Sequence, residues 1–207
     1  MDASNILRNE RIVPVVVIDD ADAASSLAEV LFEAGFGAIE ITLRTTESLQ
    51  AIENIAAAFP DRCVGAGSIR TIEQFAQIKG AGARFAVSPG SSELLLDAAA
   101  EYEMPFVPGA VTASEAIRLQ ERGYTLIKFF PAELAGGSRM LKALGGPLPE
   151  ARFFPTGGIT PKLAKDYLAL PNVACIGGSW LTPANLLAAG DFKSIARLAH
   201  DAAGLLK

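Results

Sequence analysis

One lysine lies in the middle of an apolar segment and is the first candidate for chemistry. Lys128 stands in the run Thr125–Pro131, where five apolar or aromatic residues accompany it. A buried ammonium is costly unless it is paired with an anion or loses its proton. The neutral amine is a nucleophile that forms Schiff bases with carbonyl compounds. The alternative is a lysine that protects an edge strand from aggregation, and the segment alone allows both.

A carboxylate and a guanidinium are spaced to point to one side of another predicted strand. Side chains alternate along a strand, so Glu40, Thr42 and Arg44 would share a face. Glu40 is then a candidate for proton transfer, and Arg44 for binding a substrate carboxylate. The alternative is a structural ion pair at the end of the strand.

Two glycine-rich turns are candidates for an anion site. Gly157-Gly158 precedes Thr160-Pro161, and Gly177-Gly178 precedes Thr182-Pro183. Glycines expose backbone N–H groups, and Thr-Pro is typical of a helix start, where the helix N-terminus attracts anions. We expect a phosphate site here; the alternative is two tight turns.

Two further turns are weaker candidates. Gly65–Ser68 and Ser88–Gly90 follow predicted strands and consist of small residues and proline. They could let a ligand approach the backbone, with Ser68 donating a hydrogen bond, or they could be simple turns.

The elements that must position these residues recur at regular intervals. Eight short β-branched or aromatic runs alternate with stretches of helical periodicity, of which Ala23–Ala34 and Ser92–Tyr102 are the clearest. The predicted strands are Ile12–Ile18, Ala38–Thr42, Arg62–Ala66, Phe85–Ser88, Phe106–Pro108, Thr125–Phe129, Arg152–Thr156 and Val173–Gly177. Helix starts are expected at Asp20 or Asp22, Thr45-Thr46, Thr71, Ser91-Ser92, and Thr112 or Ser114, with Gly35, Gly80, Gly82 and Gly123 after helix ends.

Eight strand–helix alternations predict an α/β fold, a compact (β/α)8 TIM barrel forming a single domain over residues 1–207. A doubly wound open sheet is the alternative, but no glycine-rich dinucleotide turn follows the first strand. Functional groups of such barrels lie at the C-terminal ends of the strands, and phosphate commonly binds after strands seven and eight. The candidate residues all fall at such positions.

Composition narrows the class of protein. The net charge is −5, and no Lys/Arg cluster suggests a nucleic-acid partner. No apolar run approaches the ~20 residues of a membrane span. Cys63 and Cys175 lie in apolar segments, which favours reduced thiols in the cytoplasm over a disulfide. His200, the one histidine, is expected on the surface of a helix, so we expect neither a metal site nor another cofactor.

The motifs taken in order resemble those of the bacterial 2-keto-3-deoxy-6-phosphogluconate aldolases, which often also cleave 4-hydroxy-2-oxoglutarate. The segments that carry the resemblance are Glu40–Arg44, Gly65–Ser68, Ser88–Gly90, Lys128–Glu133, Pro155–Ile159 and Gly177–Leu181. The resemblance covers essentially the whole chain. It implies a cofactor-independent Schiff-base aldolase, a (β/α)8 barrel and a homotrimer.

The resemblance also implies roles at the pyruvate end of the substrate. Lys128 would form the Schiff base and Glu40 would transfer the proton, through a water. Arg44 and Ser68 would hold the pyruvyl carboxylate, with Pro89 at the same site. The third-strand motif of this family commonly ends in Thr, so Ser68 keeps the hydroxyl and leaves a small change in substrate fit open.

At the other end of the substrate, Thr156 would lie near the hydroxyl groups and influence stereochemistry. Ser179 would bind phosphate together with the glycine turns (Gly157, Gly158, Gly177 and Gly178). Cleavage would yield pyruvate and glyceraldehyde 3-phosphate. The nearer rival is an aldolase that prefers 4-hydroxy-2-oxoglutarate or the galactonate epimer, and the more distant one is a non-catalytic barrel that binds a phosphorylated sugar acid.

The lysine must also become a nucleophile. We expect burial among Leu126, Phe129 and Phe130, with Arg44 nearby, to favour the neutral amine.

Overall fold

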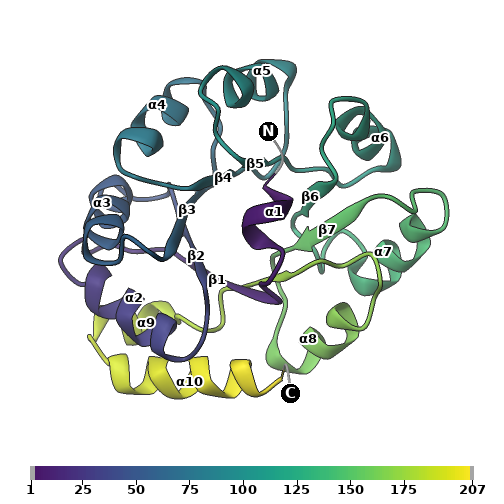
Figure 1. Ribbon diagram of the computed structural model, residues 1–207. Coiled ribbons are helices and arrows are strands. Elements are labelled where there is room, and N and C mark those ends of the chain that lie inside the picture. The colour runs from purple at the N-terminus through teal and green to yellow at the C-terminus, as the bar shows by residue number, and fades with distance from the viewer. Residues whose placement is uncertain (1–2, 206–207) are drawn as a thin grey trace.

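The computed structural model describes residues 3–205, in which strands and helices alternate around a closed barrel (Figure 1). Six strands form a parallel sheet in the order β5-β4-β3-β2-β1-β8, and β6 pairs in parallel with β7. Bridges between Gly109 and Lys128 and between Thr156 and Gly177 join the two sheets and close the barrel. The strands are β1 Ile12–Val16, β2 Ala38–Thr42, β3 Cys63–Gly67, β4 Phe85–Val87, β5 Phe106–Val107, β6 Leu126–Phe129, β7 Arg152–Pro155 and β8 Ile176–Gly178. The predicted (β/α)8 barrel is therefore confirmed; that residues 1–207 form one domain stays a prediction, since residues 1–2 and 206–207 lie outside the described ones.

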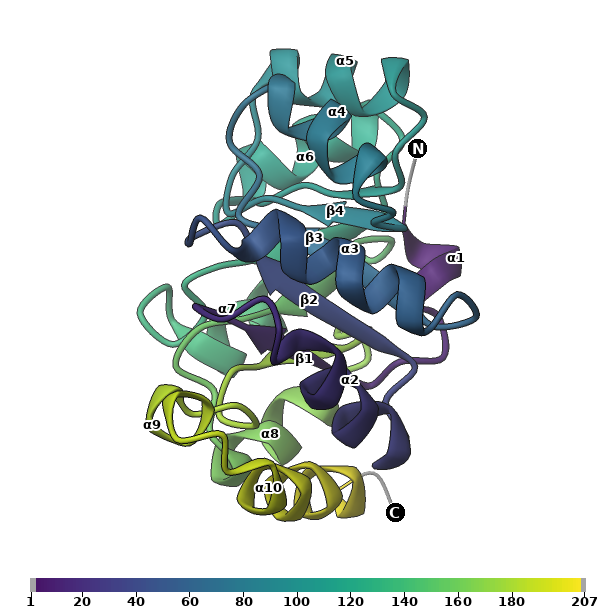
Figure 2. The same cartoon turned by 90° about the vertical axis from the view of Figure 1, so that its left-hand side faces the viewer.

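The helices surround the strands, with one exception (Figures 1 and 2). The outer helices are α2 Ala24–Glu33, α3 Ser48–Ala58, α4 Glu73–Gly80, α5 Glu93–Glu101, α6 Ala113–Glu121, α7 Gly137–Gly145, α8 Pro161–Leu168, α9 Ala184–Ala188 and α10 Phe192–Gly204. Figure 2 shows α10 beside α2, and the two are in contact. The exception is α1 (Ser4–Leu7), which lies across one mouth of the barrel.

The strands divide their side chains between two cores because alternate residues point to opposite faces. On β6, Leu126 belongs to a small cluster inside the barrel, whereas Ile127 and Phe129 belong to the larger cluster between strands and helices. Leu7 of α1 belongs to the inner cluster, so α1 closes the mouth at the N-terminal ends of the strands. The opposite mouth is left for polar side chains.

All eight predicted strands are present; β2 has the predicted bounds, and the other strands have shifted ends. β1 ends at Val16, short of Ile18, and β3 starts and ends one residue later than expected. The largest shift is at β8, because Val173 forms only an isolated bridge with Phe153. An apolar run in the sequence indicates which residues are buried. Strand ends depend on which backbone groups face a neighbouring strand, so they cannot be predicted from apolar runs alone.

Three of the expected helix caps are present. Ser92, Thr112 and Thr160 have extended backbones, and each side-chain oxygen accepts a hydrogen bond from a backbone N–H three residues later. The starts expected at Asp20 or Asp22, Thr45-Thr46 and Thr71 are wrong. The residues before α2, α3 and α4 are Ala23, Glu47 and Ile72. Their backbones are already helical, and none of their side chains makes a capping hydrogen bond.

Other local predictions have mixed outcomes. Gly35, Gly82 and Gly123 follow helices with positive φ as expected, but Gly80 is the last residue of α4. Cys63 and Cys175 are free thiols, and His200 is exposed on α10. Within residues 3–205, no helix combines the length and the apolar character needed to cross a bilayer.

Candidate active site

An ion pair between Lys128 and Glu40 crosses the interior of the barrel. The Lys128 Nζ lies 2.8 Å from Oε1 and 3.2 Å from Oε2 of Glu40. Lys128 is on β6 and Glu40 on β2, so three strands separate them in either direction around the barrel. Lys128 is 5% exposed and Glu40 0%. Lys128 is therefore not an edge lysine, and each buried charge has its partner.

The surroundings of Lys128 differ from the expectation in one respect. Its ammonium lies 5.5 Å from the centre of the Phe154 ring, a cation–π contact from the neighbouring strand. The prediction that Phe129 buries the amine is wrong, because Phe129 packs against Phe153 on the outer side of the barrel. Leu126 is on the inner side, as expected. The amine is thus held by a carboxylate and an aromatic face.

A cavity of about 20 Å³ lies beside the ion pair, which is room for about one water molecule. Its lining residues are Val15, Glu40, Thr42, Arg44, Ser68, Pro89, Lys128, Phe130 and Thr156. The structure therefore brings together six of the residues expected at the substrate site. Val15 was missed although strand alternation would have found it, and Thr42 had been given no role. Phe130 had been expected only to help bury the amine, and it lines the same cavity as Lys128.

Arg44 and Ser68 form a pair of donors at the edge of the cavity. Arg44 Nε donates to Ser68 Oγ at 3.2 Å. The alternative ion pair between Glu40 and Arg44 is wrong, since Glu40 pairs with Lys128. Ser68 has a φ of 63°, a left-handed conformation that is uncommon outside glycine and is often kept at functional sites. A guanidinium beside a hydroxyl suits a carboxylate ligand.

The hydroxyl group of Thr156 is buried without a hydrogen-bond partner. It lies in the lining of the same cavity. Gly177 on β8 leaves it room, because a Cβ there would lie 2.2 Å from Thr156 Oγ1. An unpaired buried hydroxyl costs about 1–3 kcal/mol, so its position favours contact with a ligand.

The predicted phosphate-binding turns lie next to the cavity but not in its lining. The bridge between Thr156 and Gly177 places the two turns side by side. Gly157 and Gly158 have φ of 103° and 78°, which favours glycine at both positions. Gly158 and Ser179 are exposed. The second helix start is not the expected one: α9 begins at Ala184 after Pro183, and Thr182 makes no cap.

Glu133 is held by the helix that follows the first turn. The Tyr167 hydroxyl on α8 donates to Glu133 Oε1. Burial, and then this hydrogen bond, raise the pKa of Tyr167. A Cβ at Gly158 would lie 2.9 Å from the Glu133 Cβ, so Glu133 packs closely against the turn.

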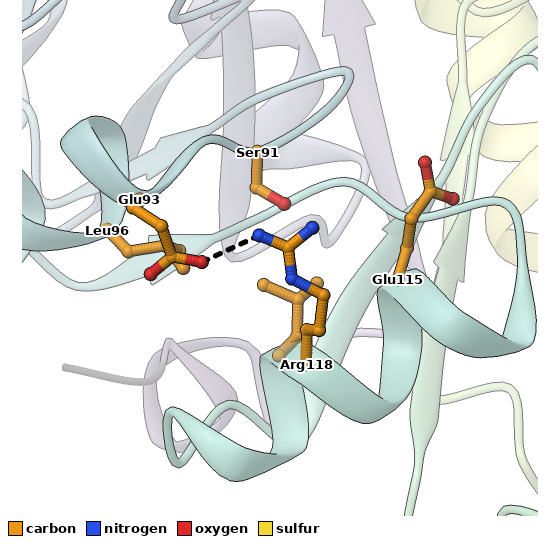
Figure 3. A pocket seen from close by; sticks show the side chains of 6 residues that line it. Ser91, Glu93, Leu96, Glu115 and Arg118 are labelled. Atoms are coloured by element: carbon orange, nitrogen blue, oxygen red, sulfur yellow. Dashed lines mark hydrogen bonds and ion pairs between the residues drawn. The ribbon is translucent and has the colours of Figure 1, made fainter.

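In another pocket, between α5 and α6, the charged side chains already have partners within the protein (Figure 3). Arg118 pairs with Glu93 at 2.9 Å, and Glu115 accepts hydrogen bonds at the start of α6. Residues 3–205 contain no group of three His, Cys, Asp or Glu side chains arranged to hold a metal. The cavity at Lys128 is therefore the best candidate for an active site.

Known proteins share this architecture along nearly the whole chain. The family model described as KDPG and KHG aldolase matches residues 3–198. The KHG/KDPG aldolase of Escherichia coli (strain K12) is 46% identical, with 97% of this chain and 94% of that protein covered. A KDPG aldolase structure from Legionella pneumophila is 42% identical, with a TM-score of 0.93 and 97% of each chain covered; it holds pyruvate captured at low pH as a covalent carbinolamine intermediate. The 2-keto-3-deoxy-6-phosphogluconate aldolase of Zymomonas mobilis ZM4, solved with 3-phosphoglycerate, is 37% identical with a TM-score of 0.90, and the match covers 98% of this chain and 95% of that one.

Proposed function

The chain belongs to the KDPG and KHG aldolase family, and we propose that it cleaves 2-keto-3-deoxy-6-phosphogluconate to pyruvate and glyceraldehyde 3-phosphate through a Schiff base on Lys128. The observation that carries the proposal is the buried ion pair of Lys128 and Glu40 beside a cavity whose lining includes Arg44. The pair supplies a nucleophile and a base in contact, which is the arrangement that covalent catalysis requires.

The first half of the reaction makes the imine. Glu40 accepts a proton from the Lys128 ammonium, and the neutral amine adds to the C2 carbonyl of the substrate. Arg44 and Ser68 bind the adjacent carboxylate and orient the carbonyl toward Nζ. Glu40 then returns its proton to the hydroxyl of the resulting carbinolamine, which leaves as water, so that a protonated imine forms and Glu40 is a carboxylate again.

The second half breaks the carbon–carbon bond. Glu40 accepts the proton of the C4 hydroxyl through the one water for which the cavity has room. The electrons of the C3–C4 bond move into the imine, which leaves an enamine and releases the aldehyde. Glu40 returns a proton to C3, and hydrolysis of the new imine releases pyruvate and restores the Lys128 amine. Side chains perform every step, so we expect turnover to persist in EDTA.

The remaining candidates serve the rest of the substrate. Thr156 has a hydroxyl free to meet a substrate hydroxyl, and we propose that it influences stereochemistry. Gly157, Gly158, Gly177, Gly178 and Ser179 stay candidates for the phosphate, with Pro89 in the wall of the pyruvate end.

Substrate preference is a separate proposal. The E. coli relative is named for both KHG and KDPG, so we propose that 4-hydroxy-2-oxoglutarate is a second substrate, cleaved to pyruvate and glyoxylate. A preference for that substrate or for the phosphogalactonate epimer is the alternative. Cleavage rates on the three substrates, measured as pyruvate release with lactate dehydrogenase, decide between them. A barrel that only binds the phosphorylated acid would release no pyruvate.

Assembly and location complete the proposal. We propose a homotrimer: Leu134 and Leu94 are 90% and 65% exposed, and exposed apolar side chains are of the kind that subunit contacts bury. Light scattering would measure the mass of the assembly. The free thiols suit a cytoplasmic location.

A further inference from the structure

An outer chamber of about 360 Å³ adjoins the catalytic cavity. It is lined by Arg44, Ser68, Arg70, Pro89 and Phe130. Four of these residues also line the cavity beside Lys128, so the chamber opens onto the cavity. Arg70 is the residue found in the chamber alone, and neither motif nor spacing had drawn attention to it.

The chamber is positively charged although the chain as a whole carries a net charge of −5. No carboxylate is in its lining. Across residues 3–205, the recorded ion pairs involve neither Arg44 nor Arg70. Lys128 and Glu40 neutralise each other at the inner end. The guanidinium groups of Arg44 and Arg70 are therefore left to act on an approaching anion.

The backbone holds Arg70 at this position. Ile69 is fully buried, and its N–H donates to Val87 O on the next strand. The N–H groups of Arg70 and Thr71 both donate to Gln74 Oε1, at 2.7 and 3.1 Å. The main chain is thus anchored on both sides while the Arg70 side chain stays exposed.

We propose that Arg70 is an anion-capture residue, which together with Arg44 makes the chamber a docking site for the carboxylate of a 2-oxo acid on its way to Arg44 and Ser68. The inference rests on the proposed function. Arg70 does not line the cavity of the reacting groups, so it is a positioning residue rather than a catalytic one. A charge at the entrance stabilises the bound ground state and the transition state equally, and therefore acts on the affinity for substrate and not on the maximal rate.

Arg118 provides a matched control. It is an exposed arginine on α6, and Figure 3 shows its guanidinium directed at Glu93. Arg118→Gln removes the same charge from the protein as Arg70→Gln. Arg118 is not in the lining of the chamber, and Glu93 keeps Arg122 as a partner when Arg118 is lost, so we expect only a small change in the potential at the chamber.

The test uses pyruvate as the probe and its trapping by borohydride on the enzyme as the readout, at low and high salt. At low salt, Arg70→Gln should raise the half-saturating pyruvate concentration about two- to fivefold, with the maximal trapping rate unchanged. The increase should vanish in about 1 M salt, where the Debye length falls to about 3 Å. The half-saturating pyruvate concentration of Arg70→Lys should stay near that of the wild type. That of Arg118→Gln should equal the wild-type value at both salt concentrations.

An unchanged half-saturating pyruvate concentration for Arg70→Gln at low salt would overturn the inference. So would an increase that persists in high salt, or an equal increase in Arg118→Gln. If Arg70→Lys bound pyruvate as weakly as Arg70→Gln does, that result would also refute a role for charge. If the wild-type protein traps no pyruvate, the proposed function fails instead, so the two failures are distinguishable.

Discussion

Gly67 on β3 leaves room for the carboxylate of Glu40 on the neighbouring β2. A Cβ added to Gly67 would lie 2.1 Å from Glu40 Oε1 and 2.8 Å from its Cδ. The sequence had suggested that a ligand could approach the backbone of this turn. At Gly67 the Glu40 carboxylate already occupies that space. The missing side chain of Gly67 permits the position from which Glu40 reaches Lys128.

Gly67→Ala should displace the Glu40 carboxylate and lower kcat by about 100-fold, because a shift of about 1 Å at a reacting group can have an effect of that size. Gly80→Ala is the control, since nothing lies within 4 Å of a Cβ at Gly80 in α4. It should keep full activity and gain about 0.5–1 kcal/mol of stability. Steady-state kinetics of the two variants would contradict this account if both retained wild-type kcat.

The ion pair also predicts a pattern of stabilities. Glu40→Gln or Lys128→Met leaves one buried charge unpaired, and each should lower the free energy of unfolding by about 3–5 kcal/mol. The double variant leaves neither charge and should recover most of that loss. Urea denaturation of the four proteins measures the coupling, and strictly additive losses would mean that the pair is not formed.

The sequence predicted the strands and singled out Lys128 and Glu40, which the structure brings together, but it did not show how they meet. Lys128 and Glu40 stand out because each occupies an unusual place in a strand, yet their contact depends on barrel closure, which no local pattern contains. The error at Phe129 was avoidable, since the alternation that grouped Glu40 with Arg44 also separates Phe129 from Lys128. Arg70 gave no signal, because its place in the chamber follows from the left-handed backbone at Ser68 and the packing of Ile69.

Thr156→Val should make the protein more stable and less active. The buried hydroxyl has no partner, so its replacement by a methyl group should raise the free energy of unfolding by about 1–3 kcal/mol. Activity should fall because the hydroxyl that we propose for contact with the substrate is lost. Thr182 has the other buried hydroxyl without a partner in residues 3–205 and lies outside the cavity. Thr182→Val should therefore gain stability while it keeps most of its turnover; a loss of turnover in both variants would argue against a specific role for Thr156.

The Cys63 thiol should be unreactive at neutral pH. Burial raises its pKa to about 11, so at pH 7 only about one thiol in ten thousand is a thiolate. Alkylation of Cys63 by iodoacetamide, followed by mass spectrometry, should be very slow at pH 7 and accelerate up to about pH 11. The raised pKa also means that thiolate formation favours the unfolded chain, so the free energy of unfolding should fall as the pH rises from 9.0 toward 11. Cys63→Ala should weaken that fall, and fast alkylation at pH 7 would contradict the raised pKa.

The most direct test of the central claim is to find where pyruvate becomes attached. The protein is incubated with pyruvate and borohydride, digested, and examined by mass spectrometry. The account predicts a stable N-carboxyethyl group on Lys128 and on no other lysine, together with loss of activity, and no such adduct in Lys128→Met. Continued turnover with an unmodified Lys128, or an adduct on another lysine, would contradict it.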